Sequence, residues 1–227
     1  LFRSFPKVCK NLDVDHSSLT EIYRLVKDHP KVKHAFVGSG VRYDLLVPKD
    51  DTHDQANGLS EYTEQLIRHH VSGRLKVAPE HTADHVLKIM RKPSFKLFHA
   101  FKKQFQKISD KVGKKQELIP YFISSHPGTS SEDMANLACE TNELGFHLEQ
   151  VQDFTPTPMT VATEIYYSGV HPYTGKPVSQ NRDERTKKLQ NLFFFWYKKE
   201  NRGAVQHELS KIGRPDLWER LTQRKRI

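Results

Sequence analysis

Four times along this chain, an apolar run ends abruptly in small or functional residues just before a helical pattern begins. The four copies lie at residues 35–44, 75–82, 118–129 and 151–158. Buried parallel strands read as unbroken apolar runs, and α/β proteins place their chemistry where such strands end. Four endings of this kind in one chain predict a shared site at one edge of a parallel sheet.

The spacing of these runs also predicts the fold. Strands are expected to begin near residues 32, 74, 117 and 147, with helical patterns between them. This alternation favours parallel strands joined by right-handed helical crossovers. No Gly-x-Gly-x-x-Gly follows the first strand, which disfavours a dinucleotide-binding sheet. We therefore expect an α/β fold with a partial (β/α) barrel over residues 1–158, about four parallel strands present, and a turn-rich, helical C-terminal extension over residues 159–227.

Several helix boundaries can be predicted from local signals. Ser17 and Ser18 with Glu21 form the pattern of a capping box, and Thr82 is expected to cap a short helix that runs to Met90. Residues 48–57 are polar and are predicted to form a loop. Ser130 stands just before a further helical pattern, whose first turn carries acidic residues suited to the positive end of the helix dipole.

A longer helix beginning near Pro93 is predicted to bury one aromatic face. Phe95, Phe98, Phe101 and Phe105 recur at helical spacing, which is typical of core residues. The opposite face carries lysines, which we interpret as a solvated surface. These are Lys96, Lys102, Lys103, Lys107 and Lys111.

Composition limits the class of protein and its partners. The 227 residues carry a formal net charge of +9, which raises the chance of a polyanionic partner such as RNA, although a merely basic surface explains the charge as well. No stretch approaches the ~20 apolar residues of a membrane span, and no signal peptide opens the chain. With only two cysteines, a secreted disulfide scaffold is disfavoured, and we expect a cytoplasmic protein without membrane contact.

The predicted strand ends hold the candidate site residues. Gly38, Ser39 and Gly40 would allow a ligand close to the backbone, although a plain tight turn explains them equally well. Glu80 could accept bonds from ribose hydroxyls or bind a cation, unless it or the next residue opens the following helix. Asp153 precedes two prolines spaced by one residue, which hold the backbone extended.

The strongest local signal is the segment 124–129, Ser-Ser-His-Pro-Gly-Thr. It combines a strand end, a proline-fixed turn, a glycine and capping candidates for the next helix. Such a segment can offer backbone groups to an aromatic base or an anion, while ordinary turn chemistry remains the alternative. We expect Ser39, Glu80, His126 and Asp153 to gather around a common mouth on one rim of the sheet.

The two cysteines have different expected roles. Cys139 falls between apolar positions of a predicted helix and is expected to be a core residue. Cys9 lies in an irregular opening segment and could be a metal ligand only with partners upstream of the chain.

Taken in order, residues 38–44, 75–82 and 118–129 resemble the YgiQ-like radical SAM proteins. The segments 8–16, 151–154 and 166–169 agree with that pattern, so the resemblance covers nearly the whole chain up to about Trp196. Each segment is short, and it is their combination that is specific.

The resemblance implies a partial barrel of the radical SAM type that binds S-adenosylmethionine beside a 4Fe–4S cluster. It implies that Gly38, Ser39, Gly40 and Glu80 lie along the methionine and ribose parts of that cofactor. The residues implied to border its adenine and ribose are Ile123, Ser125, His126, Pro127, Asp153 and Phe154. A reductant such as a flavodoxin or ferredoxin is implied as a partner, and the substrate is unassigned.

One departure from the family pattern is decisive. The Cys-x-x-x-Cys-x-x-Cys motif that holds the cluster in radical SAM enzymes is absent from the 227 residues. The strands present would then be the third to sixth, with the cluster segment upstream. We therefore expect this chain alone to have an incomplete pocket and no radical chemistry.

Two other functions remain open at this point. A metal-dependent hydrolase on a similar barrel could use a set of strand-end ligands that suits Zn or Mn. That set would be Asp44, Glu80, His81, His126 and Asp153. A basic RNA-binding module could use the lysine-rich helix face, where neutralising Lys102, Lys103 and Lys107 would abolish salt-dependent binding.

Overall fold

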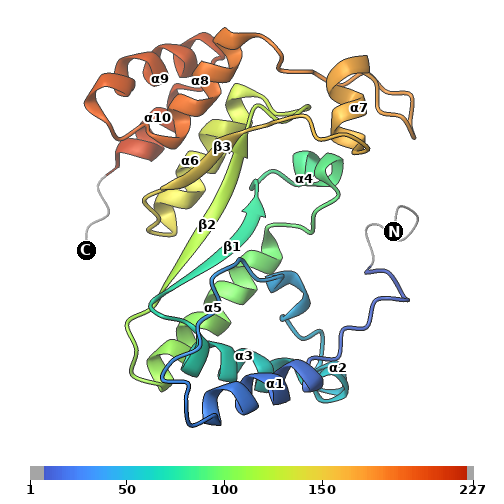
Figure 1. The fold of residues 1–227 in the computed structure, drawn as a ribbon. Helices are drawn as coiled ribbons and strands as arrows, with labels where there is room; N and C mark the ends of the chain where they lie inside the picture. The colour runs from blue at the N-terminus through green and yellow to red at the C-terminus, as the bar shows by residue number, and fades with distance from the viewer. Residues whose placement is uncertain (1–7, 224–227) are drawn as a thin grey trace. The chain divides into compact units, whose positions relative to one another are not determined.

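The computed structural model describes residues 8–223, which form an α/β fold (Figure 1). The chain divides into two compact units that we describe separately. Unit 1 comprises Leu1–Ala78 and Phe95–Pro120, and unit 2 comprises Pro79–Ser94 and Tyr121–Ile227. Within the described residues, no helix is both long and apolar enough to cross a bilayer.

A three-stranded sheet with the order β1-β2-β3 runs through the chain. Its strands are β1 (Arg74–Glu80), β2 (Glu117–Ser124) and β3 (Gln150–Asp153). Strands β2 and β3 are parallel, with Ser124 opposite Asp153 at their carboxyl ends. Burial alternates along β1 and β2, so that one face of each strand is the better covered. The prediction of parallel strands at these three places is confirmed.

The prediction of a strand that begins near residue 32 is wrong. Residues 32–37 have no strand pairing, and Phe36 is half exposed. Further along the chain, Val41 forms a single parallel bridge with Val77 of β1, and the Val41 amide donates to the Lys76 carbonyl at 3.2 Å. Apolar residues alternate poorly with Lys33 and His34, and the glycines that follow carry no side chain to pack, so a ladder cannot extend.

Unit 1 contains helices as well as the first part of β1. They are α1 (Ser17–Asp28), η1 (Tyr43–Leu45), α2 (Asp51–Asn57), α3 (Leu59–Gln65), η2 (Leu66–His70) and α5 (Lys96–Lys111). The predicted polar loop at 48–57 is wrong over most of its length, because α2 forms there. The Asp50 side chain caps α2 by accepting the His53 amide at 2.8 Å, so a polar sequence still makes a helix.

Two predicted helix caps are also wrong. Helix α1 begins at Ser17 with no side-chain cap, because Asp15 accepts both the amide (2.8 Å) and the hydroxyl (2.6 Å) of Ser17. Helix α4 (Asp84–Met90) follows Ala83, and Thr82 provides no cap, because the His81 ring takes the Thr82 and Ala83 amides instead.

The predicted aromatic face of α5 is confirmed. Phe98 and Phe101 are fully buried, and Phe105 is nearly so. The Tyr43 ring of η1 meets the Phe98 ring edge-on with the ring centres 5.8 Å apart, a favourable aromatic geometry. These rings make the apolar core of unit 1.

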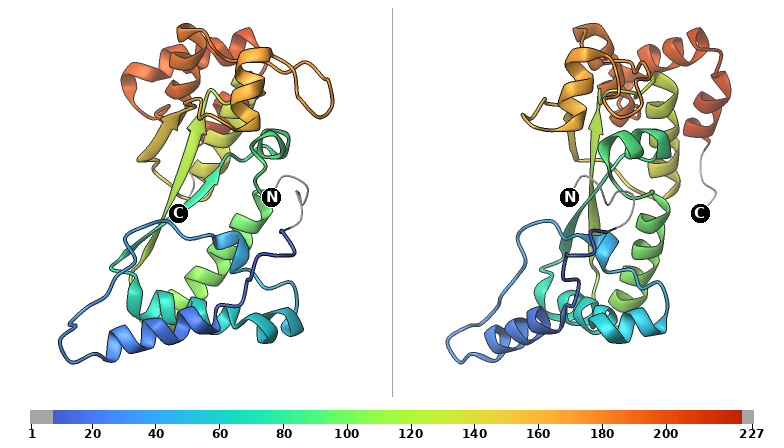
Figure 2. Two further views of the ribbon diagram at one scale, coloured as in Figure 1. Left: turned by 45° about the vertical axis from the view of Figure 1, so that its right-hand side comes forward. Right: turned by 90° about the vertical axis from the view of Figure 1, so that its right-hand side faces the viewer.

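Unit 2 contains α4 and a C-terminal group of helices. They are α6 (Ser131–Glu143), α7 (Val161–Ser168), α8 (Glu184–Phe194), α9 (Lys199–Lys211) and α10 (Pro215–Thr222). Helices α6, α8, α9 and α10 pack on one another, as Figures 1 and 2 show. Ser130 forms a reciprocal capping box with Asp133, as its position in the sequence suggests. Helix α7, in the segment expected to be turn-rich, is capped by Thr160 and ends at Gly169 with φ 71°.

Candidate functional site

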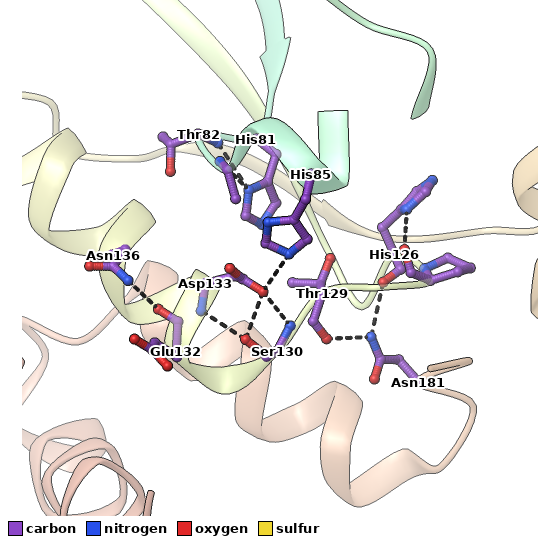
Figure 3. A network of polar contacts seen from close by, with 12 residues as sticks. His81, Thr82, His85, His126, Thr129, Ser130, Glu132, Asp133, Asn136 and Asn181 are labelled. Carbon is purple, nitrogen blue, oxygen red and sulfur yellow. Dashed lines mark hydrogen bonds and ion pairs between the residues drawn. The ribbon is translucent and has the colours of Figure 1, made fainter. Parts of the chain in front are cut away.

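Two turns at the carboxyl ends of neighbouring strands carry the candidate site, and both belong to unit 2. The first, residues 80–83, connects β1 to α4; the second, residues 125–130, connects β2 to α6. Figure 3 shows Thr129 of the second turn lying between the His81–His85 pair and His126. Ligands in open α/β folds bind at this edge of the sheet.

Both turns begin with a residue in a left-handed backbone conformation. Glu80 has φ 68° and Ser125 has φ 60°, and neither is glycine. Such conformations cost roughly 1–3 kcal/mol and cluster at ligand-binding sites. The Glu80 carboxylate, which is 15% exposed, lies 3.1 Å from the Lys92 ammonium group at the end of α4. The left-handed backbone at Glu80 therefore places its carboxylate, held by the ion pair with Lys92, at the end of β1.

His81 is buried and neutral. Its Nδ1 accepts the backbone amides of Thr82 and Ala83, both at 3.0 Å, so the ring proton must be on Nε2. Burial is the main cause that lowers the pKa of His81 to about 3. The ring is 0% exposed, and Nε2 has no hydrogen-bond partner in the described structure. His81 thus presents a buried N–H donor that no residue between 8 and 223 accepts.

His126 is held in the opposite tautomer. The Pro127 carbonyl can only accept, so Nδ1 of His126, 2.9 Å away, carries the proton and Nε2 is an acceptor. Burial lowers the pKa of His126 to about 4, although the bond to Pro127 opposes that shift. The Phe154 ring, which follows β3, meets the His126 ring edge-on with the ring centres 4.8 Å apart. The predicted neighbours His126 and Phe154 therefore do lie together.

Unpaired polar atoms concentrate in these turns. Among residues 8–223, four buried side-chain polar atoms have no hydrogen-bond partner: His81 Nε2, Ser125 Oγ, Thr129 Oγ1 and His53 Nδ1. The first three belong to the two turns, whereas His53 lies in unit 1. Each unpaired group costs roughly 1–3 kcal/mol, so natural proteins seldom retain them without a use. Three unpaired polar groups at one edge of the sheet are suited to bind a polar ligand.

Asp153 lies at the carboxyl end of β3, opposite Ser124 of β2. Its Oδ1 accepts one hydrogen bond from the Ser124 hydroxyl and a second from the Asn191 amide at 3.3 Å. The Phe154 amide donates to the Ser124 carbonyl at 2.8 Å, which fixes the chain as it leaves the sheet. Ile123 lies one position before Ser124, opposite Gln152 in the register. Asp153 is therefore anchored while its side chain remains exposed.

The remaining predicted residues lie in unit 1. At Gly40 an added Cβ would be 3.4 Å from the Lys76 carbonyl oxygen, whereas Gly38 has open space around it, and Ser39 is exposed. Arg42 binds the Asp44 carboxylate through two hydrogen bonds of 2.8 and 2.6 Å, so these two charges pair with each other. Ser39 belongs to unit 1, whereas Glu80, His126 and Asp153 belong to unit 2, so the expected gathering of these four residues stays a prediction.

The described residues offer no grouped metal ligands. Between residues 8 and 223, no three His, Cys, Asp or Glu side chains lie close enough to hold a metal ion. Cys9 is half-buried, and the suggested hydrolase ligands do not form such a group. Cys139 is a core residue, as expected: its thiol points at the Leu217 carbonyl, and burial raises its pKa to about 11.

The lysine face of α5 gives no support for an RNA groove by itself. Lys111 forms an ion pair with Glu64 at 2.9 Å, and Glu64 also binds Arg68 at 2.7 Å. Lys103 and Lys107 are exposed. RNA binding stays a prediction from the net charge.

Comparison with known proteins adds a family to this geometry. A UPF0313 protein of Bacteroides thetaiotaomicron is 58% identical over 95% of the chain, and one of Porphyromonas gingivalis is 54% identical over 96%. This chain is homologous to UPF0313 proteins. UPF0313 is the YgiQ-like family, which agrees with the resemblance of the sequence segments. A UPF0313 protein of Pseudomonas aeruginosa is 41% identical over 94% of the chain.

The UPF0313 relatives are much longer than this chain, which spans 35% and 34% of the length of the first two. A family model described as a domain of unknown function, DUF3362, matches residues 149–222. This region begins at β3 and ends with α10, so it includes Asp153, Phe154 and the helices packed on α6.

Sequence reasoning missed several residues of the site. Thr129 was expected only as a helix cap, and His81 as a metal ligand or as the first residue of a helix, whereas both present unpaired polar atoms. Asn181 and Gln190, about 60 residues beyond the turn, were not expected at all, although both bind its backbone. These two residues meet the turn only in the folded chain. The one available signal in the sequence was that Gln190 is a glutamine on the apolar side of a predicted helix.

Proposed function

We propose that unit 2 of this chain holds the nucleoside part of S-adenosylmethionine in a radical SAM enzyme. The observation that carries the proposal is the set of three unpaired buried polar atoms at the ends of β1 and β2, His81 Nε2, Ser125 Oγ and Thr129 Oγ1. The family resemblance and the UPF0313 homology support the same reading. S-adenosylmethionine, together with a reduced 4Fe–4S cluster, supplies radical chemistry when bound.

The donor set of these turns fits a nucleoside. Adenine and ribose present ring nitrogens and hydroxyls, which need both donors and acceptors in an otherwise apolar pocket. His81 offers an N–H, and Ser125 and Thr129 offer hydroxyls that can donate or accept. Phe154 adds an aromatic surface beside His126. Low pKa values keep both histidines neutral at pH 7, so these rings act through hydrogen bonds and not through charge.

Glu80 is the residue we assign to the ribose. A carboxylate can accept hydrogen bonds from two neighbouring hydroxyls, and these bonds are stronger than those of a neutral acceptor. The ion pair with Lys92 keeps the carboxylate in place, and the left-handed backbone at Glu80 turns the chain at the end of β1.

The cysteines of this chain do not fit the cluster. Cys139 is buried in unit 2 with its pKa raised, and Cys9 has no second cysteine near it in sequence. A cluster bound by three closely spaced cysteines would need ligands from another part of the protein. We therefore assign nucleoside binding to this chain and derive no step through the cluster.

A pair of threonine variants tests the proposal. Thr129→Val removes the unpaired hydroxyl with little change in shape, whereas Thr141→Val removes a hydroxyl that is already bonded to the Leu137 carbonyl at 2.8 Å. Binding of S-adenosylmethionine and of S-adenosylhomocysteine is measured by calorimetry on the full chain. Loss of one ligand hydrogen bond of about 1–2 kcal/mol should weaken binding by about 5- to 30-fold in Thr129→Val. Thr141→Val should bind as the wild type does.

Two results would contradict the proposal. One is the absence of nucleoside binding by the wild-type chain at millimolar ligand. The other is equal affinity in the wild type and Thr129→Val, since the hydroxyl would then not face the ligand.

A further inference from the structure

The backbone of the second turn is held from the region that the DUF3362 model matches. Asn181 and Gln190, the latter in α8, reach the turn formed by residues 125–129 (Figure 3 shows Asn181). We propose that Asn181 and Gln190 are positioning residues that fix this turn in its ligand-binding conformation. This inference rests on the proposed nucleoside site and gives the C-terminal region a role in it.

Gln190 joins the two ends of the turn through one side-chain amide. Its oxygen accepts the Ser125 amide at 2.8 Å, and its nitrogen donates to the Thr129 carbonyl at 3.1 Å. The residue is 1% exposed, so both bonds are shielded from water and losing either would leave a buried group unpaired. Because Ser125 has a strained φ of 60°, a bond at its own amide directly opposes relaxation of that strain.

Asn181 holds the middle and the end of the same turn. Its side-chain nitrogen donates to the His126 carbonyl at 2.9 Å and to the Thr129 carbonyl at 2.7 Å. Asn181 itself has φ 54°, a conformation that asparagine adopts more readily than most residues. The Gly128 amide donates to the Ser179 carbonyl at 2.9 Å, so the segment around Asn181 contacts the turn along its length.

The turn is also confined by packing. A Cβ added at Gly128, whose φ is 85°, would lie 2.5 Å from Ile89 Cδ1 and 3.4 Å from Val178 Cγ1. Helix α4 therefore covers one side of the glycine, and the segment before Asn181 contacts it as well. A turn with so little free space has few alternative conformations.

These contacts separate the backbone of the turn from its side chains. The backbone groups of Ser125, His126, Gly128 and Thr129 bond to the C-terminal region, and the Pro127 carbonyl bonds to the His126 ring. The hydroxyls of Ser125 and Thr129 are left unpaired. A backbone that is fixed before binding spares the ordering cost that a flexible loop would incur on binding. Asn181 and Gln190 thus raise affinity without touching the ligand.

The test combines hydrogen exchange with nucleoside binding on the full chain. Gln190→Met removes both hydrogen bonds with a side chain of similar length. Its control is Gln180→Met, which removes a side-chain hydrogen bond to the Tyr167 carbonyl and none to the turn. Asn181→Gly removes the hydrogen bonds from Asn181 to the turn. Glycine tolerates the positive φ at this position, so this variant should keep the fold even if Gln190→Met does not.

We expect faster exchange at the Ser125 amide in Gln190→Met, and at least tenfold weaker binding of S-adenosylmethionine. Asn181→Gly should weaken binding by about threefold or more, while Gln180→Met should match the wild type in both measurements. Unchanged Ser125 exchange in Gln190→Met, or faster exchange with unchanged affinity, would overturn the inference.

The binding data also separate this inference from the proposed function. If the wild type binds no nucleoside, the proposed function fails and the inference falls with it. If the wild type binds and Thr129→Val weakens binding while the Gln190 and Asn181 variants do not, only the positioning role is overturned.

Discussion

The molecule contains two buried clusters of opposite chemistry. In unit 1, Phe98 and Phe101 of α5 pack with Tyr43, and their rings are almost entirely covered. In unit 2, His81, Ser125 and Thr129 are equally buried, yet each carries a polar atom without a partner. The first cluster stabilises the fold, whereas the second carries a cost that folding alone does not explain.

This difference separates stability from function. Burial of an aromatic ring is favourable by itself, so nothing further is needed to account for α5. Burial of an unpaired donor is unfavourable, and strained backbone at Glu80 and Ser125 adds to the cost. Substitutions in the two clusters should therefore have different, and in one case opposite, effects on stability.

The largest expected effect is in the aromatic cluster. Phe101→Ala should lower the free energy of unfolding by about 3–5 kcal/mol, because it removes a fully buried ring and leaves a cavity. Urea denaturation followed by circular dichroism measures this loss. Phe36→Ala, at a half-exposed ring, is the control and should cost far less. Similar losses in the two variants would mean that α5 is not the core of unit 1.

His81 and His126 should make stability depend on pH. Both have a pKa lowered by burial, to about 3 for His81 and about 4 for His126, against 6.5 when unfolded. Their neutral forms favour the folded state above pH 6.5, and this contribution is lost as the pH falls toward the folded pKa values. Between pH 6.5 and pH 5 each histidine should account for about 2 kcal/mol of lost stability.

Denaturation at several pH values measures this effect as a slope. His126→Asn and His81→Asn should each remove the contribution of one histidine from the acid-dependent loss, whatever their effect on absolute stability. His85→Asn is the matched control, because that ring is largely exposed. A slope that persists unchanged in both buried-site variants would show that these rings are not held neutral.

The two threonines should differ in sign. Thr129→Val removes a buried hydroxyl without a partner and should leave stability unchanged or raise it by about 1 kcal/mol. Thr141→Val removes a bonded hydroxyl in α6 and should cost about 1 kcal/mol. Thermal denaturation of both variants tests this contrast. Equal destabilisation by both would indicate that the Thr129 hydroxyl is bonded in the free protein.

The smallest expected effect is at the strained turn. In Ser125→Gly, relief of the left-handed strain opposes the greater backbone entropy that glycine loses on folding. Stability should stay within about 0.5 kcal/mol of the wild type, while nucleoside affinity falls because the hydroxyl is gone. Melting temperature and calorimetric affinity, measured on the same sample, separate these effects. A marked loss of stability would mean that the Ser125 hydroxyl is structural.

The sequence predicted the apolar cluster better than the polar one, for physical reasons. Helical spacing alone identifies the buried face of α5, because periodicity reports which side meets the core. The strand ends near Glu80, Ser124 and Asp153 could be located from the points where apolar runs stop. The partners of the turn could not, since Asn181, in the loop before α8, and Gln190, in α8, reach it only in the folded chain.

The failures at the beginning of the chain have a related cause. Residues 32–37 read as a strand by composition, but a strand needs a neighbour along its length, and only Val41 pairs with β1. Residues 48–57 read as a loop by polarity, yet the Asp50 cap is enough to start α2. Local composition does not report either tertiary pairing or the geometry of a cap.

The most direct test of the ligand site is the nitrogen NMR spectrum of the His81 ring. In the free protein, the spectrum should show a neutral ring protonated at Nε2. Addition of S-adenosylmethionine should shift the Nε2 resonance and slow exchange of its proton, because the donor gains an acceptor. Saturating ligand that leaves the His81 resonances unchanged would contradict a nucleoside site at these turns.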